Sequence, residues 1–220
     1  MAERSSWGVM RYDFVLWDFD GTLADTFAVM VGAYNALADT RGLRPVDDPQ
    51  AARRLAPLAL LNGLGIPLAR LPAVVAEVLA AVRREMPNIP LFPGVAGVLE
   101  ALRRSGPRMA VLSSNSRENV LACLRANGAH EYFEDVVGYR RIFGKGRAIR
   151  RMIRSWGVSG GKAVYVGDEV RDVAAARQAG VEIAAVTWGY NTREILAAQQ
   201  PAYLADSPDE LLTLLDGQPR

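Results

Sequence analysis

The amino-acid sequence predicts an α/β protein in which helices cover both faces of a parallel sheet. Short apolar runs alternate with helical patterns over much of the 220 residues, and this alternation is typical of a parallel sheet. The runs are almost continuously apolar, as expected for strands that are buried on both faces. A block that contains only helical patterns interrupts the alternation after the first run, which indicates an inserted helical domain.

Five apolar runs are the predicted strands of the sheet. They span residues 13–20, 108–114, 134–139, 162–168 and 181–188. The helical patterns between them end in glycine, a residue that favours helix C-termini. These predicted helices span residues 94–106, 116–128, 144–157 and 169–180. The order of the elements predicts a Rossmann-like parallel sheet.

After the first predicted strand the alternation stops, and only helical patterns follow. These patterns span residues 27–42, 49–65 and 71–86. Asp25 precedes the first of them and is expected to cap that helix or to lie in its first turn. Residues 86–94 contain three prolines and are interpreted as a linker. We therefore predict a helical domain over residues 25–91, inserted into a core domain of residues 1–24 and 92–220.

Composition and charge argue against several classes of function. The chain is 50% apolar and 23% charged, and its formal net charge of +2 gives no strong bias toward nucleic acid or membranes. Basic residues are spread along the chain in pairs, which favours solvated helix faces over a nucleic-acid interface. No apolar stretch approaches the length of a membrane span, and residues 1–11 lack the apolar segment of a signal peptide. The expected location is therefore the cytoplasm.

Rare residue types narrow the chemistry further. Cys123 is the only cysteine, so no intrachain disulfide is possible, and it is expected to pack in the core. His130 is the only histidine, so a zinc site is not expected. Of the 26 basic residues, only Lys145 and Lys162 are lysines. A lysine retained in such a sequence is a candidate for a role that arginine cannot fill. The alternative that both lysines are incidental stays open.

Four polar stretches each follow an apolar run. They are "DFDGT" (18–22), "LSSNS" (112–116), "FGKGR" (143–147) and "GDEVRD" (167–172). Because the carboxyl ends of parallel strands share one edge of a sheet, these four loops can converge. Strand ends at that edge are where open α/β sheets bind ligands, so the sequence predicts the functional site there.

The converging loops would bring five carboxylates to this edge of the sheet. They are Asp18, Asp20, Asp168, Glu169 and Asp172. Carboxylates crowded in this way repel one another, and a hard divalent cation removes the repulsion. Mg²⁺ takes oxygen ligands octahedrally and is usually held by one or two carboxylates together with a substrate phosphate. The sequence therefore predicts a magnesium-dependent site for a phosphate group.

Other residues of the same loops suit a phosphate group. Ser114 and Lys145 would supply a hydroxyl donor and a positive charge to the phosphate oxygens. Gly21 permits close approach of the backbone, and Thr22 is expected to cap or brace the loop. Asn115 is expected to support the phosphate loop. Gly21, Thr22, Ser114 and Asn115 are therefore the expected substrate-binding residues.

Taken together, these stretches resemble a known superfamily. "DFDGTLADT", "LSSN", the lone Lys145 and "GDEVRD" are similar to the four ordered motifs of the haloacid dehalogenase superfamily. The helical insert directly after the first motif, and "LFPGV" leading back into the core, resemble its phosphoglycolate phosphatase-like branch. The resemblance covers about residues 12–216, and it implies that the insert is a cap domain over the active site.

The resemblance implies a catalytic role for three residues. Asp18 resembles the nucleophile that takes the phosphoryl group as an aspartyl-phosphate. Asp20 resembles the general acid that protonates the leaving alcohol and then the base that activates water, and its backbone carbonyl would also bind the metal. Lys145 matches the third-motif lysine, which neutralises charge on the nucleophile and the phosphoryl group.

The remaining motif residues match binding roles. Ser114 matches the second-motif hydroxyl, with Ser113, one residue earlier, as the alternative. Asp168 matches a direct metal ligand, and Glu169 and Asp172 would assist, with contacts through metal-bound water as one possibility. Asp172 could instead simply line one face of the following helix. The metal set that the resemblance implies is Asp18, Asp20, Asp168, Glu169 and Asp172.

The resemblance implies a Mg²⁺-dependent phosphatase for a small phosphorylated metabolite, either phosphoglycolate-like or a sugar phosphate. A sugar-phosphate mutase shares the core motifs, so this alternative function stays open. A non-catalytic binding module on the same fold is a second open alternative. Asp20 argues against a dehalogenase, because cleavage of a carbon–halogen bond needs no leaving-group acid. The insert has no lysine, which excludes a lysine-imine mechanism. No Ser or Thr follows Lys145, which departs from a P-loop.

The sequence says less about the substrate. Arg53 and Arg54 in the insert could meet a substrate carboxylate, but both could also be surface arginines. Pro57 stands where relatives often have a glycine, and an apolar stretch follows it, which puts the phosphoglycolate assignment in doubt. The expected partner is a small-molecule phosphate ester, with no nucleic acid and no membrane, and the chain is expected to be a monomer or a homodimer.

Overall fold

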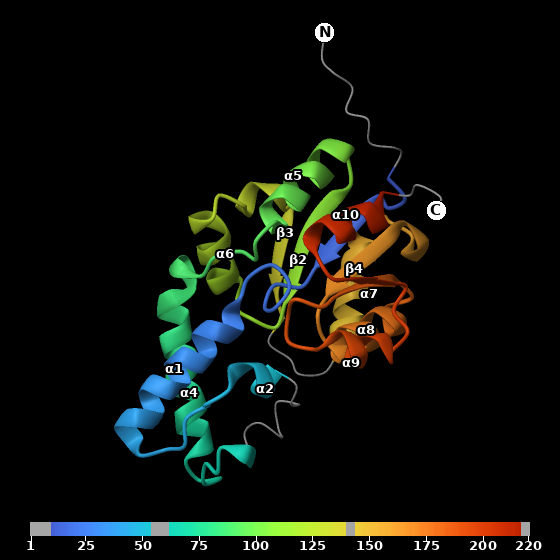
Figure 1. Ribbon diagram of the computed structural model, residues 1–220. Coiled ribbons are helices and arrows are strands. Elements are labelled where there is room, and N and C mark those ends of the chain that lie inside the picture. Colours follow the sequence, from blue (N-terminus) through green and yellow to red (C-terminus); the bar gives the residue numbers. More distant parts are fainter. Residues whose placement is uncertain (1–9, 54–61, 140–143, 217–220) are drawn as a thin grey trace.

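A computed structural model describes residues 10–53, 62–139 and 144–216. Its centre is a six-stranded, all-parallel sheet with the strand order β3-β2-β1-β4-β5-β6 (Figure 1). The strands are β1 (Phe14–Trp17), β2 (Arg108–Ser113), β3 (Asp135–Gly138), β4 (Ala163–Gly167), β5 (Glu182–Val186) and β6 (Tyr203–Ala205). The five predicted strands are confirmed, each shorter than its apolar run, and β6 is an additional edge strand.

Helices cover both faces of this sheet, as predicted. One face packs against α5 (Val95–Ser105), α6 (Arg117–Ala126) and α10 (Pro208–Leu215), and the other packs against α7 (Lys145–Ser155), α8 (Val170–Ala179) and α9 (Arg193–Ala197). Alternate residues of β1 supply the two cores, because successive side chains of a strand point to opposite faces. Val15 and Trp17 belong to the first core, and Phe14 and Leu16 belong to the second.

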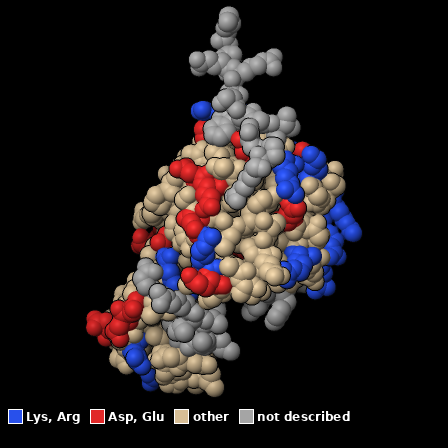
Figure 2. Space-filling model, turned by 45° about the vertical axis from the view of Figure 1, so that its right-hand side comes forward, with Lys and Arg blue, Asp and Glu red and all other residues tan. Residues whose placement is uncertain are grey.

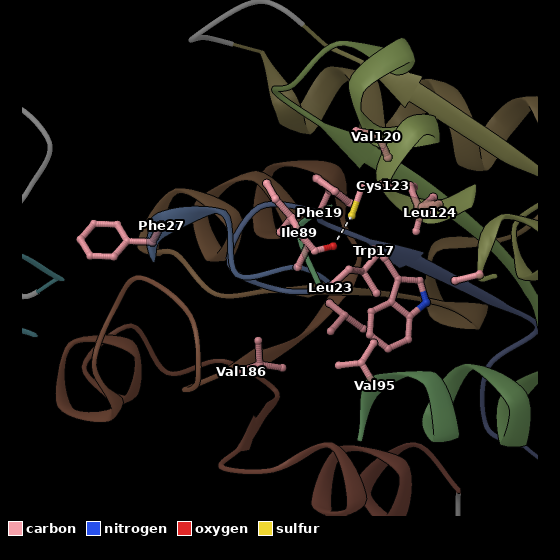
Figure 3. Close-up of a cluster of buried hydrophobic side chains, with 14 of the residues drawn as sticks. Trp17, Phe19, Leu23, Phe27, Ile89, Val95, Val120, Cys123, Leu124 and Val186 are labelled. Carbon is pink, nitrogen blue, oxygen red and sulfur yellow. Dashed lines mark hydrogen bonds between the residues drawn. The ribbon is translucent and has the colours of Figure 1, made fainter. Parts of the chain in front are cut away.

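The first core also holds the single cysteine. Figure 3 shows Cys123 among buried apolar side chains, with its thiol directed at the backbone carbonyl of Ile89 at an Sγ–O distance of 3.3 Å. Burial raises the pKa of the Cys123 thiol to about 11. The expectation that this cysteine packs in the core is confirmed.

Between β1 and α5 the regular elements that the structure describes are helices joined by turns and loops. They include α1 (Thr26–Arg41), α2 (Pro49–Arg53), α4 (Leu71–Glu85) and the 3-10 turn η1 (Met86–Asn88). Figure 1 shows α1 and α4 side by side, projecting away from the sheet. Of the helix expected at 49–65, α2 covers Pro49–Arg53, and residues 54–61 of that stretch lie outside the described residues.

The chain enters and leaves this helical segment at neighbouring points. Ala24 and Leu91 form an isolated antiparallel bridge, and the Phe92 amide donates to the Leu23 carbonyl at 2.9 Å. The two connections therefore form a paired stalk between the core and the inserted helices. The domain boundaries proposed at 24/25 and 91/92 stay predictions.

Two surface properties accompany this fold. Within the described residues, none of the helices combines the length and the apolar character that crossing a bilayer would need. Basic and acidic side chains are interspersed on the face shown in Figure 2, which agrees with the small net charge.

Candidate active site

The site begins at the carboxyl end of β1. Asp18 directly follows this strand and its side chain is only 3% exposed. The carboxylate accepts a hydrogen bond from the Phe19 amide on Oδ1 at 2.8 Å and one from Lys145 Nζ on Oδ2 at 2.6 Å. Both oxygens are thus held by donors from the protein, so the carboxylate is fixed in orientation.

Lys145 joins two of the predicted acidic residues. It is the first residue of α7, and its Nζ lies 2.6 Å from Asp18 Oδ2 and 2.6 Å from Asp172 Oδ1. The other oxygen of Asp172 accepts the Glu169 amide at 3.1 Å, which fixes Asp172 in the first turn of α8. Burial disfavours the charged lysine, but Asp172 and Asp18 outweigh that effect and raise the pKa of Lys145 well above its ordinary value. The lysine is therefore held as a cation.

Three carboxylates crowd around this lysine. Oxygen atoms of Asp18, Asp168 and Asp172 lie within 4.8 Å of one another, and all three residues are buried. Burial, opposed by Lys145 and reinforced by Asp172, raises the pKa of Asp18 from 3.8 to about 7. Burial and the neighbouring Asp172 and Asp18 raise the pKa of Asp168 well above its usual range. One lysine does not balance three buried carboxylates, and a divalent cation with oxygen ligands fits this donor set.

The surroundings of Asp168 fix its direction. Its Oδ1 accepts a hydrogen bond from Thr22 Oγ1 at 2.7 Å, and its Oδ2 accepts one from the Tyr190 amide at 2.7 Å. A Cβ atom at Gly21 or at Gly189 would lie 2.2 or 2.3 Å from Asp168 Oδ2, and Gly21 has a φ of +78°. Both glycines are therefore required by close packing against this carboxylate.

Asp20 faces a different group of residues. Its Oδ2 lies 3.1 Å from the donor Ser113 Oγ, and its Oδ1 accepts from Asn115 Nδ2 at 3.2 Å. The sequence favoured Ser114, with Ser113 as the alternative, but the hydroxyl that meets Asp20 is that of Ser113. Ser113 is the buried last residue of β2, whereas Ser114 is exposed at the rim. The reason is the pleat of β2, which sends neighbouring side chains in opposite directions.

Glu169 stands apart from the carboxylate cluster. Its Oε1 pairs with Arg171 at 2.5 Å, and burial raises its pKa. The metal-ligand geometry found among the described residues includes Asp18, Asp168 and Asp172 but neither Glu169 nor the carboxylate of Asp20. The structure therefore brings three of the five predicted metal-binding side chains together.

Comparison with known proteins places this arrangement in a family. The model of the haloacid dehalogenase-like hydrolase family matches residues 15–186. The chain belongs to this family. It is 37% identical over 204 residues to a phosphoglycolate phosphatase of Synechococcus elongatus, a match that covers 90% of this chain and 94% of the relative. It is 34% identical over 213 residues to the probable phosphatase IndB of Dickeya dadantii, covering 90% of this chain and 91% of that protein.

Solved structures show the same fold. A haloacid dehalogenase-like hydrolase from Streptococcus pneumoniae superimposes with a TM-score of 0.75 at 21% identity, covering 92% of this chain and 98% of that one. A predicted phosphoglycolate phosphatase from Haemophilus somnus gives 0.80 at 20% identity, with coverages of 94% and 99%. Membership in the haloacid dehalogenase superfamily and its phosphoglycolate phosphatase-like branch is confirmed, and with it the prediction of an enzyme of the phosphoric monoester hydrolase class.

In this haloacid dehalogenase-like hydrolase, Asp20 opens onto a cavity of about 620 Å³ between the core and the inserted helices. The inserted helices contribute Met30, Leu79, Val82 and Arg83 to its lining, and the core contributes Asn119 and Arg171. Arg171 is paired with Glu169. In the described part of the chain, Arg83 has no carboxylate partner. The sequence had given no signal for Arg83 beyond its helical position.

Arg53 has a role that the sequence did not predict. Its guanidinium pairs with Asp25 at 2.9 Å, donates to the carbonyls of Trp188 and Gly189 at 3.2 Å each, and lies 5.0 Å from the ring centre of Phe27. With these partners it is neither a free surface arginine nor a free carboxylate ligand. Arg54 and Pro57 lie outside the described residues.

Asp25 has a second contact besides this ion pair. Its Oδ1 accepts the Ala28 amide at 3.3 Å, so its predicted position as the cap of α1 is confirmed. The loop after β5, which carries the two carbonyls bound by Arg53, was not predicted as part of the site.

Proposed function

We propose that the protein is a Mg²⁺-dependent phosphatase that hydrolyses a small phosphate monoester through an aspartyl-phosphate on Asp18. The observation that supports this most strongly is the contact of Lys145 with Asp18 beside two further buried carboxylates. Asp20, two residues after Asp18, lines a cavity large enough for a metabolite.

The carboxylates of Asp18 and Asp168 and the backbone carbonyl of Asp20 would hold the metal, with Asp172 close by. Bound there, Mg²⁺ would supply positive charge to the phosphoryl oxygens and keep Asp18 ionised. This second effect is needed because Asp18 must attack as a carboxylate, whereas burial favours its neutral form near neutral pH. Lys145 acts in the same direction from the other side.

The reaction divides into two steps at these residues. An oxygen of Asp18 forms a bond to phosphorus while the bond between phosphorus and the leaving oxygen breaks, and Asp20 gives its proton to that leaving oxygen. Asp20 then takes a proton from water as the water oxygen attacks phosphorus and releases Asp18. Lys145 stabilises charge on the phosphoryl oxygens in both steps, and the Ser113 hydroxyl does so while Asp20 is protonated.

The substrate class follows from the cavity and from the relatives. A phosphoglycolate phosphatase of Synechococcus elongatus is 37% identical, and the carboxylate of phosphoglycolate would find an unpaired cation in Arg83. A sugar phosphate would use Asn119 and the apolar lining instead. We place a phosphorylated hydroxy acid first and a sugar phosphate second.

A panel of esters tests the proposal. Purified protein with Mg²⁺ is given phosphoglycolate, glycerol phosphate, glucose 6-phosphate and p-nitrophenyl phosphate, and released inorganic phosphate is measured. Turnover of at least one ester, abolished in a folded Asp18→Asn variant, is the expected result. A rearranged phosphate ester without phosphate release would indicate a mutase, and binding without any turnover would indicate a binding module. Activity retained by Asp18→Asn would refute the assignment of the nucleophile.

A further inference from the structure

The carboxyl group of Asp20 is held by a short chain of amides. Asn115 Nδ2 donates to Asp20 Oδ1 at 3.2 Å, and Asn119 Nδ2 donates to Asn115 Oδ1 at 2.9 Å. Asn115 Oδ1 also accepts the backbone amide of Ser116 at 2.9 Å. Asn115 lies in the loop after β2, and Asn119 lies in the first turns of α6. Asn119 also lines the cavity that Asp20 faces.

This arrangement determines which end of the Asn115 side chain meets Asp20. A side-chain amide has a donor end and an acceptor end, and it can present either one after a half-turn. Here two donors, from Asn119 and from the Ser116 backbone, converge on Oδ1 of Asn115. A half-turn would place the Asn115 amide nitrogen against both donors. The donor end is therefore the one that faces Asp20.

We propose that Asn119, acting through Asn115, is a positioning residue for the general acid Asp20. The inference rests on the proposed function, because it concerns the proton transfers of that reaction. Asn115 always donates to Oδ1 of Asp20, so Oδ2 is the oxygen left to exchange a proton. Oδ2 faces the hydroxyl of Ser113, which can donate or accept by rotating, so that hydroxyl serves either protonation state.

Both proton transfers of the reaction then take place at the same oxygen, Oδ2 of Asp20. In the first step the proton leaves Oδ2 for the leaving oxygen as the phosphorus–oxygen bond breaks and Asp18 becomes phosphorylated. In the second step Oδ2 takes a proton from the attacking water, and Asp18 is released with inorganic phosphate. Without the contact from Asn119, only the Ser116 backbone amide opposes a half-turn of the Asn115 amide, and the distinction between Oδ1 and Oδ2 of Asp20 weakens.

Leaving-group dependence separates this role from a merely structural one. An alkyl ester needs a proton on its leaving oxygen, whereas p-nitrophenolate leaves without one. We compare kcat/KM, which reports the phosphorylation step, for p-nitrophenyl phosphate and for the alkyl ester of the panel that the wild type uses best. Asn119→Ala removes the donor, and Asn119→Asp is close to isosteric and replaces the donor by an acceptor.

The expected result is that both variants lower the alkyl-to-aryl ratio of kcat/KM by about tenfold, which is part of the roughly hundredfold or more that general acid catalysis contributes, because Asp20 itself stays in place. Arg125→Gln is the control, because it makes the same change of charge on an exposed position of α6 as Asn119→Asp. Its ratio should equal that of the wild type. If Asn119→Asp does not fold, Asn119→Ala carries the comparison.

Two outcomes would overturn the inference. An equal loss of kcat/KM with both esters would mean that Asn119 only supports the loop, and an unchanged kcat/KM with both esters would mean that Asp20 needs no such support. If the wild type hydrolyses neither ester, the proposed function itself fails, and the inference falls with it. A wild type active on both esters with an unchanged ratio in the variants refutes the inference alone.

Discussion

Raising the pH in the absence of divalent metal is expected to destabilise the protein, because burial favours the neutral form of the Asp18 carboxyl. The pKa of this group is about 7 in the folded protein, against 3.8 as its ordinary value. Below pH 3.8 both states bind the proton. Between the two values the unfolded chain has lost the proton while the folded chain still holds it. Stability therefore falls as the pH rises through this window and levels off above pH 7.

The size of the effect follows from the same two values. The difference between 3.8 and about 7 corresponds to ~4 kcal/mol in the free energy of unfolding. About 3 kcal/mol of this stability is lost between pH 5 and pH 8. For a chain of this length that loss lowers Tm by roughly 6–12 °C. The raised pKa of Asp168 acts in the same direction.

The assay is thermal unfolding in buffers from pH 5 to pH 8, with chelator or with saturating Mg²⁺. The fall in Tm should be large with chelator and small with Mg²⁺, because a bound cation offsets the charge of the ionised carboxylates. Asp18→Asn removes one of the titrating groups and should make the chelator curve less steep, with Asp168 contributing the slope that is left. Asp13→Asn, an exposed acid just before β1, should leave that curve as in the wild type.

Two results would refute the reasoning. The first is a Tm that stays level or rises from pH 5 to pH 8 in chelator. The second is an Asp18→Asn variant with the slope of the wild type, since the pH dependence would then come from other groups.

Three further predictions concern single side chains. Ser113→Ala should lower kcat/KM roughly tenfold to a hundredfold, as expected for losing a hydrogen bond to a charged group. Ser114→Ala should leave kcat/KM within about twofold of the wild type. Equal effects of the two variants would contradict the contact geometry. Arg53→Ala should lower the free energy of unfolding by about 1–3 kcal/mol in urea titrations because it leaves the half-buried Asp25 unpaired. Arg41→Ala, which breaks an exposed pair with Glu77, should cost under about 1 kcal/mol, and the reverse order would be inconsistent with the packing. Arg83→Gln should raise KM for phosphoglycolate about tenfold relative to KM for p-nitrophenyl phosphate. Arg84 donates to a carbonyl of its own helix, so Arg84→Gln should leave both KM values unchanged. The same effect in both variants would show that Arg83 does not bind the substrate.

The sheet could be predicted because strands buried on both faces leave a strong apolar signal. The apolar runs overestimated the strands, since buried residues such as Phe19 continue past the last ladder bond of β1. The edge strand β6 (Tyr203–Ala205) was missed for the opposite reason. It has three residues, pairs only with β5 and is half-buried, so it is too short to show a period.

The meeting of the four loops was also predictable, because it depends only on strand direction. The choice between two adjacent serines was not, because it depends on where β2 ends. Ser113 pairs with Gly138 as the last residue of the strand, which turns its side chain to Asp20 and leaves Ser114 at the rim. A shift of one residue in that end point exchanges the two side chains.

The contacts of Arg53 lie beyond any reading of sequence spacing. Its partners are Asp25, Phe27 and the carbonyls of Trp188 and Gly189, which come from segments more than a hundred residues apart. No local pattern marks an arginine for such a site. Only the packing of α2 against the loop after β5 creates it.

The loop after β5 connects the inserted helices to the carboxylate cluster. Arg53 binds the carbonyls of Trp188 and Gly189, and the next residue, Tyr190, donates its amide to Asp168. The indole nitrogen of Trp188 donates to the Thr22 carbonyl at 3.0 Å, and the Thr22 hydroxyl donates to Asp168. Asp168 is therefore oriented from two directions by groups linked to the Arg53 contacts, the Tyr190 amide next to Gly189 and the Thr22 hydroxyl whose carbonyl binds Trp188. Arg53 thus links α2 through this loop to a carboxylate that is packed against two glycines and has little room to adjust.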